Sequence, residues 1–172
     1  MANNCMVGIQ IVTTTETDGE QLHGILTSAK MTADKKREGV YIGCERRYLF
    51  DAQIFRDRDT VQVFGWLKWG FSDDEVKKFI AWLKTQIEIN ELRINYDECG
   101  CLLYGEYRYA DGKLTQRYLP AEHFPDDDDS DHFDIELESA LKRYGITEEI
   151  PLTQTFAISL ISRWLLTYFT LN

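Results

Sequence analysis

The sequence has few basic residues and no run of lysine or arginine. Its 29 acidic side chains outnumber the 19 basic ones, which gives a net charge of −10 over 172 residues. A chain with this charge is repelled by phosphate backbones unless a local basic patch overrides the sum. We therefore expect no direct binding to nucleic acid.

The sequence also lacks an uninterrupted apolar stretch of the length that a membrane requires. Its longest apolar segment, 152–171, carries Arg163 close to the middle, whereas a spanning helix needs about 20 mostly apolar residues without a central charge. The N-terminus has neither the charged region nor the apolar run of a signal peptide. With 44% apolar residues the chain can bury a core without disulfides, so its four cysteines indicate a reducing compartment. We expect a cytoplasmic protein.

Residues that carry enzyme chemistry are scarce or poorly spaced. None of the three histidines stands in a recognised nucleophile motif, and no glycine-rich loop joins a strand to a helix as a phosphate cradle would. We expect no enzymatic activity and no cofactor. The rival hypothesis is an enzyme whose site is assembled from separated acids such as Asp97, Glu98 and Glu106.

Cys99-Gly100-Cys101 is the first candidate for metal chemistry, since residues two apart on a strand share a face. A tetrahedral zinc site needs about four ligands, and no further cysteine or histidine lies at a supporting spacing. We prefer two buried cysteines flanking a glycine bulge.

An acidic run, Asp126–Asp129, dominates the charge of the second half. Residues 122–149 hold 11 acidic and 2 basic side chains. Asp127, Asp129, Asp131 and Glu138 match positions 1, 3, 5 and 12 of a calcium loop, but His132 stands where that loop needs glycine. We interpret the run as a solvated acidic linker that binds no metal.

The apolar periodicity predicts an α+β fold with two helices behind one mainly antiparallel sheet. The expected strands cover 5–15, 40–56, 60–69 and the chain from Leu92, and a hairpin with its turn at Asp111-Gly112 follows them. The expected helices cover 18–37, capped by Thr17 or Asp18 and ended by Gly39, and 73–86, opened by a Ser72–Glu75 capping box. The order β-α-β-β-α-β is the ferredoxin-like arrangement. We expect this domain over 1–119, the acidic linker over 120–133 and a helical extension over 134–172.

Several short motifs carry a resemblance to a known family. They are the opening Met1-Ala2-Asn3 with Cys5, the segment 63–72, Tyr96-Asp97-Glu98-Cys99-Gly100, and Leu103-Tyr104-Gly105. In order and spacing over residues 1–118 they resemble the plasmid- and phage-borne YubB-type ferredoxin-like family. The resemblance implies the fold and a mobile-element setting, and therefore the cytoplasm of a bacterial host, and it assigns no site residue.

Aromatic residues gather on strands predicted to be neighbours. They are Phe64, Trp66, Trp69, Tyr104, Tyr107 and Tyr109. Such rings can stack single-stranded bases when basic residues flank them. We prefer burial in the core or beneath the C-terminal helix, because few basic residues are nearby.

The C-terminal segment is the strongest interaction candidate. Phe156, Leu160 and Trp164 form an apolar stripe at helical spacing over 153–169, and such a helix must be buried against something. We expect it to dock on its own sheet or to bind a protein partner or a second copy. The predicted function is a non-enzymatic accessory protein of a phage or plasmid that acts by protein–protein binding. The alternative is an inhibitor that mimics DNA through Asp126–Asp129.

Overall fold

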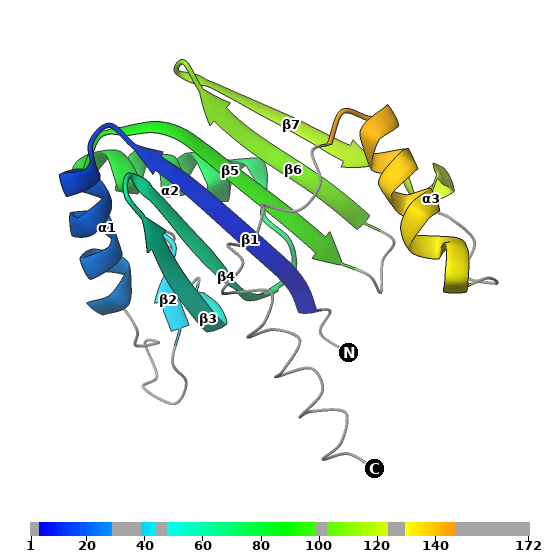
Figure 1. Ribbon diagram of the computed structural model, residues 1–172, viewed down its shortest axis with the longest axis horizontal. Helices are drawn as coiled ribbons and strands as arrows, with labels where there is room; N and C mark the ends of the chain where they lie inside the picture. Colours follow the sequence, from blue (N-terminus) through cyan, green and yellow to red (C-terminus); the bar gives the residue numbers. More distant parts are fainter. Residues whose placement is uncertain (1–3, 29–38, 44–47, 99–102, 124–129, 147–172) are drawn as a thin grey trace, which may run out of the picture.

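The computed structural model describes residues 4–28, 39–43, 48–98, 103–123 and 130–146, and in α3 it describes side chains from Glu136 onward. These residues form an α+β protein with a seven-stranded antiparallel sheet and three α-helices (Figure 1). In chain order the elements are β1 (Asn4–Thr13), α1 (Glu16–Ser28), β2 (Gly39–Tyr41), β3 (Tyr48–Asp57), β4 (Thr60–Lys68), α2 (Asp73–Gln86), β5 (Ile89–Glu98), β6 (Leu103–Ala110), β7 (Lys113–Leu119), the 3-10 helix η2 (Ala121–His123) and α3 (Ser130–Arg143).

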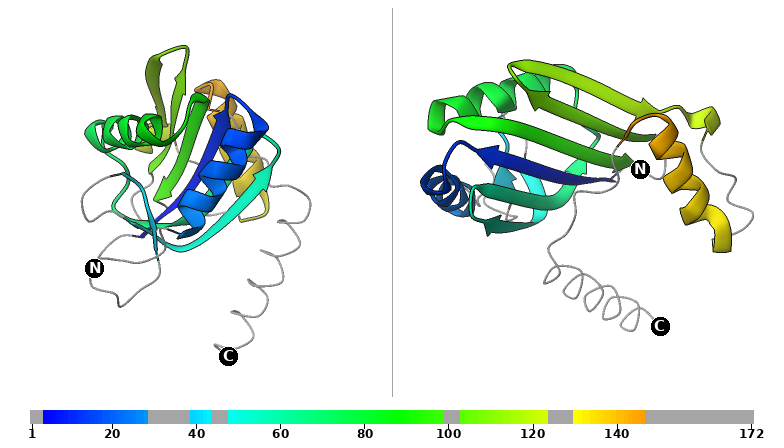
Figure 2. Two further views of the ribbon diagram at one scale, coloured as in Figure 1. Left: turned by 90° about the vertical axis from the view of Figure 1, so that its left-hand side faces the viewer. Right: turned by 45° about the horizontal axis from the view of Figure 1, so that its top comes forward.

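The strands lie in the order β2-β3-β4-β1-β5-β6-β7, and every neighbouring pair is antiparallel. Strand β1 is central, and Ile9 lies opposite Val63 on one side and Ile94 on the other. Cross-strand partners point to the same face of the sheet, so the side chains of these three residues lie together in the core. Both α1 and α2 cover this same face, as predicted (Figure 2). The core includes Cys5, Val7, Ile9, Ile11, Leu22, Leu26, Val61, Val63, Val76, Phe79, Leu83, Leu92 and Ile94.

The starts of the two covering helices differ in how well the sequence predicted them. The Ser72–Glu75 capping box of α2 is confirmed: the backbone N–H of Glu75 donates to Ser72 Oγ, and that of Ser72 donates to Glu75 Oε2. The predicted cap of α1 is wrong, because Thr15 Oγ1, not Thr17 or Asp18, accepts the N–H of Asp18 at 3.1 Å. Helix α1 is described only to Ser28.

The predicted long strand over 40–56 is also wrong, because two strands, β2 and β3, occupy that range and pair with each other. Gly43 follows β2 with φ of +70°, a conformation that ends the extended chain. A Cβ atom there would lie 2.8 Å from Cβ of Trp82 on α2. Gly39 lies in β2, and the predicted end of the helix before it lies outside the described residues.

The chain after β5 forms the predicted hairpin and then a third helix. Asp111 and Gly112 both have positive φ, as a two-residue type I′ turn requires. Helix α3 begins at Ser130, so the end of the predicted 120–133 linker is helical. Asp131 falls in the first turn of α3.

Tyr107 joins the sheet to the start of α2, and Gln116 links it to Tyr96. The Tyr107 hydroxyl donates to Asp73 Oδ1 at 3.0 Å and accepts from Gln116 Nε2 at 2.8 Å. The same amide donates to Tyr96 Oη at 3.1 Å. Burial raises the pKa of both phenols above the usual value of about 10, and the hydrogen bond to Asp73 raises the pKa of Tyr107 further.

We therefore expect the free energy of unfolding to fall as the pH rises above about 10. The unfolded chain loses its phenolic protons near that pH, while the folded chain retains those of Tyr96 and Tyr107. Below it the raised pKa values contribute their full stability. Urea unfolding at several pH values measures how steeply the free energy of unfolding falls with pH. A Tyr107→Phe variant with the same pH dependence would show that Tyr107 does not contribute to it.

Candidate interaction surface

The candidate surface is the face of the sheet opposite α1 and α2, which we call the open face. Among the described helices, only α3 packs on it, at the β6–β7 end (Figures 1 and 2). The strand registers assign to it Met6, Gly8, Gln10, Val12, Gln62, Phe64, Trp66, Lys68, Glu91, Arg93, Asn95, Asp97, Tyr104, Glu106, Arg108, Arg117 and Leu119.

Large apolar side chains are exposed at one end of β1 and β4, and the strand registers place two of them on the open face. Met6 and Trp66 are direct cross-strand partners of β1 and β4, and they are 42% and 44% exposed. Trp69 follows β4 at the same end of the sheet and is 55% exposed. We call these three residues the apolar corner. Isolated exposed hydrophobic residues are ordinary, but neighbouring ones mark a binding surface.

A polar cluster lies on β5 and β6 of the same open face. Arg93 Nε donates to Glu106 Oε2 at 2.9 Å and is 3.1 Å from Asn95 Oδ1. The side chains of Arg93 and Glu106 are only 11% and 3% exposed. Charges this deeply buried are tolerated when they are paired and hydrogen-bonded. The cluster therefore holds β5 and β6 together and leaves the Glu106 carboxylate engaged by arginine.

A second ion pair on the same two strands is solvated. Arg108 Nε donates to Glu91 Oε1 at 2.8 Å, and these side chains are 53% and 34% exposed. Both pairs join β5 to β6 across a diagonal of the open face. They differ mainly in burial, which makes the exposed pair a matched control for the buried one.

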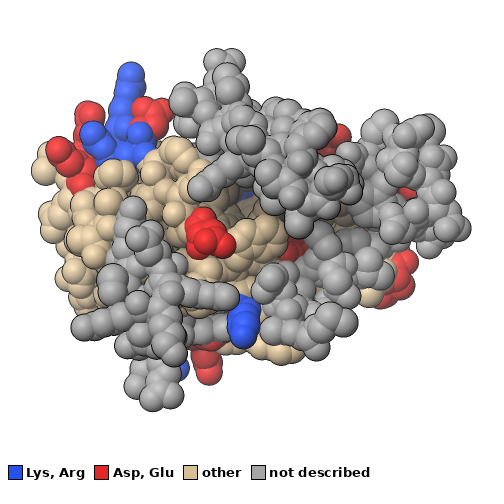
Figure 3. Space-filling view, turned by 90° about the horizontal axis from the view of Figure 1, so that it is seen from below, with Lys and Arg blue, Asp and Glu red and all other residues tan. Residues whose placement is uncertain are grey.

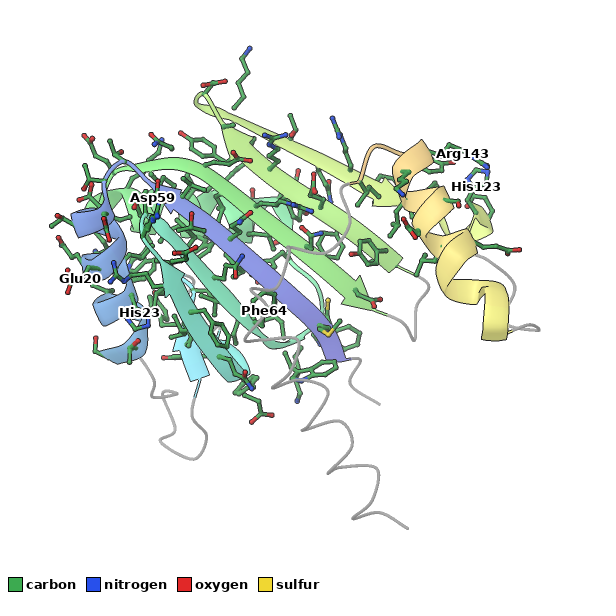
Figure 4. The ribbon with its side chains drawn as sticks, viewed as in Figure 1. Glu20, His23, Asp59, Phe64, His123 and Arg143 are labelled. Atoms are coloured by element: carbon green, nitrogen blue, oxygen red, sulfur yellow. The ribbon has the colours of Figure 1, made fainter. Side chains whose placement is uncertain are left out.

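Helix α3 closes the opposite end of the open face. Leu141 and Ile146 pack against Tyr104 of β6 and Leu119 of β7 in a second, smaller core. Arg117 of β7 donates to the carbonyl of Gly145, and His123 contacts Tyr144 at the end of α3, beside Arg143 (Figure 4). The last described residues of the chain are thereby fixed on this face.

Most of the predicted interaction residues lie outside the described residues. Asp126, Asp127, Asp128, Asp129, Phe156, Leu160 and Trp164 belong to this group, as do Cys99, Gly100 and Cys101. Predictions that concern them, including the DNA-mimic alternative, stay predictions.

The calcium-loop match lies largely outside the described residues, since Asp127, Asp129 and the side chain of Asp131 are not described. Glu138 lies in α3 and pairs with Lys142, one turn further along the helix. Among the residues described, no group of three metal-ligating side chains is assembled.

The acids of the rival enzyme hypothesis are only partly brought together. Asp97 and Glu106 share the open face on neighbouring strands. Glu106, however, accepts from Arg93. The side chain of Glu98 lies outside those described.

The six aromatic residues do not form one platform. The registers place Phe64, Trp66 and Tyr104 on the open face, whereas Tyr107 and Tyr109 point into the core beneath α2. On the side shown in Figure 3, the described lysines and arginines form no continuous patch. The alternation along 60–69 already separated Phe64 and Trp66 from Val61 and Val63. What the sequence pattern missed is the pairing of Trp66 with Met6 of β1, which no local signal contains.

No helix within the described ranges is both long and apolar enough to cross a membrane. Comparison with known proteins found no matching family model, no matching curated protein and no matching solved structure.

Proposed function

We propose that this protein is a non-enzymatic accessory protein of a phage or plasmid that binds another protein through the open face. The apolar corner carries the proposal: Met6, Trp66 and Trp69 expose large side chains at one end of β1 and β4. Exposed aromatic and methionine side chains are enriched in protein interfaces, where they act as anchors. The mobile-element setting rests on the family resemblance of residues 1–118.

We also propose that β1, α1, β3, β4, α2 and β5 form a ferredoxin-like unit. Its support is the strand order β3-β4-β1-β5 with two helices on one face. In this arrangement β2 extends one edge, and the β6–β7 hairpin extends the other. The open face then corresponds to the sheet surface that this unit leaves free of its own two helices.

Capture from bacterial lysate, followed by mass spectrometry, tests the binding function. We expect Trp66→Glu to reduce recovery of a specific protein by on the order of tenfold or more, as loss of an interface anchor does. Tyr118→Glu is the matched control, because Tyr118 is 55% exposed but points from β7 to the helix-covered side. Equal recovery by both variants and the unchanged protein would contradict the proposal.

A further inference from the structure

We propose that β7 pairs antiparallel with β7 of a second copy of this chain across a two-fold axis, so that the two sheets join into one. The inference goes beyond the proposed function, because it uses the edge of the sheet and not the open face. Pairing of this kind is β-strand addition, in which main-chain hydrogen bonds supply the affinity.

Strand β7 is the longer of the two edge strands. It has seven residues and β2 has three, and within the described ranges no strand continues the sheet beyond either of them (Figure 1). The exposed residues of β7 are Lys113, Thr115, Gln116, Arg117 and Tyr118. Very short edge strands resist pairing with other chains, whereas a longer exposed one is a template for it. A further strand is therefore added at β7.

The β6–β7 turn fixes which backbone groups of β7 point outward. In a two-residue hairpin the residues that flank the turn, Ala110 and Lys113, form a hydrogen-bonded pair, and such pairs alternate with non-hydrogen-bonded ones along the ladder. Leu114, Gln116 and Tyr118 are therefore the non-hydrogen-bonded positions, and their N–H and C=O groups point away from β6. In the described part of the chain these groups form no backbone hydrogen bond outside the sheet.

These three positions are self-complementary in one register. When Gln116 lies opposite Gln116 of the second copy, Leu114 lies opposite Tyr118 of that copy, and Tyr118 opposite its Leu114. All three pairs are then hydrogen-bonded, which gives about six interchain hydrogen bonds at two for each pair. A two-fold axis through the Gln116 pair generates this register, as a closed dimer requires.

The side chains match in the same register. Tyr118 is 55% exposed and points to the helix-covered side of the sheet, where it meets Leu114 of the second copy. Cross-strand contact between an aromatic ring and an apolar side chain stabilises a sheet. On the open face, the basic residues Lys113 and Arg117 lie opposite uncharged residues of the second copy, so no two like charges are directly opposed.

The pairing edge does not carry the acidic excess of the chain. β7 has two basic and no acidic side chains, although the net charge of the whole chain is −10. In 0.15 M salt, repulsion between exposed charges is screened beyond about 8 Å. We therefore expect added salt to strengthen the dimer.

An acidic strand of another protein is the other occupant to consider. Arg117 already donates to the carbonyl of Gly145, so Lys113 is the one basic side chain of β7 left to attract carboxylates. The second copy also brings Leu114 to the exposed ring of Tyr118. The observations therefore favour a second copy.

Sedimentation equilibrium of the full chain at about 1–100 μM tests the inference. We expect a monomer–dimer equilibrium with a dissociation constant on the order of 10 μM in 0.15 M salt, because a single strand pair forms a small interface. Tyr118→Pro removes one outward N–H and the ring but no β6–β7 hydrogen bond, so it should raise the dissociation constant by on the order of tenfold or more.

A pair of opposite charges tests the register. Tyr118→Glu should weaken the dimer, and adding Leu114→Lys should restore it, because the two substituted positions face each other across the two-fold axis. Within one chain the positions lie about 13 Å apart along β7 and do not pair. Trp66→Glu should leave the dimer intact, which distinguishes β7 from the apolar corner. Circular dichroism establishes that each variant is folded.

Four results would overturn the inference. They are a monomer throughout the concentration range, a dimer that Tyr118→Pro leaves intact, a double variant that associates no better than Tyr118→Glu, and loss of the dimer in Trp66→Glu. Partner capture is a separate measurement. Because Tyr118→Glu leaves the open face unchanged, it should capture the partner even as a monomer.

Discussion

Replacing Glu106 with alanine is expected to lower the free energy of unfolding by about 3–5 kcal/mol. The substitution leaves the guanidinium of Arg93, whose side chain is 11% exposed, without its carboxylate. Asn95 Oδ1 remains as a neutral acceptor and does not compensate the charge. Urea unfolding followed by circular dichroism at neutral pH measures the loss.

Glu91→Ala is the control for this prediction. It breaks the ion pair with Arg108 on the same strands of the open face, but those side chains are 34% and 53% exposed. Exposed pairs contribute about 0–1 kcal/mol. Equal losses for Glu106→Ala and Glu91→Ala would show that burial does not set the strength of the Arg93–Glu106 pair.

Replacing Gly105 with alanine is expected to destabilise the fold by about 1–3 kcal/mol, through overpacking. Gly105 lies opposite Tyr96 in the β5–β6 register, and a Cβ atom there would lie 2.1 Å from Tyr96 Oη and 2.2 Å from Cζ. The ring is buried and its hydroxyl accepts from Gln116, so it cannot tilt away without losing contacts.

A double-mutant cycle with Tyr96→Ala separates this clash from other effects. In the Tyr96→Ala background, Gly105→Ala should cost much less, because the added methyl group enters space that the ring vacated. Gly24→Ala serves as a control, since nothing lies within 4 Å of a Cβ atom at this helical position, and it should stabilise α1 by up to about 1 kcal/mol. The same cost of Gly105→Ala in both backgrounds would contradict the clash.

Local signals were sufficient where neighbouring residues in the sequence also interact in the structure. The Ser72–Glu75 box set the start of α2, Asp111-Gly112 set the β6–β7 turn, and alternation along β4 separated Val63 from Phe64. Each of these features depends on contacts within a few residues of the chain. The α+β class and the covering of one face by both helices followed from them.

Long-range pairing decided the features that the sequence left open or predicted wrongly. The 40–56 segment became two strands because Gly43 turns back against Trp82 of α2. Which face of the sheet the aromatic residues of β4 and β6 occupy was decided by the pairing of these strands with β1 and β5.

For the candidate surface, too, some features followed from the sequence and others only from the tertiary structure. By itself the sequence determined the fold class, the second helix, the last hairpin and the apolar stripe of the C-terminal segment. Only the tertiary structure paired Met6 with Trp66, buried Glu106 against Arg93 and fixed Ile146 on the open face. Each of these contacts joins separate elements, and the sheet order that brings those elements together depends on the whole core rather than on any local motif.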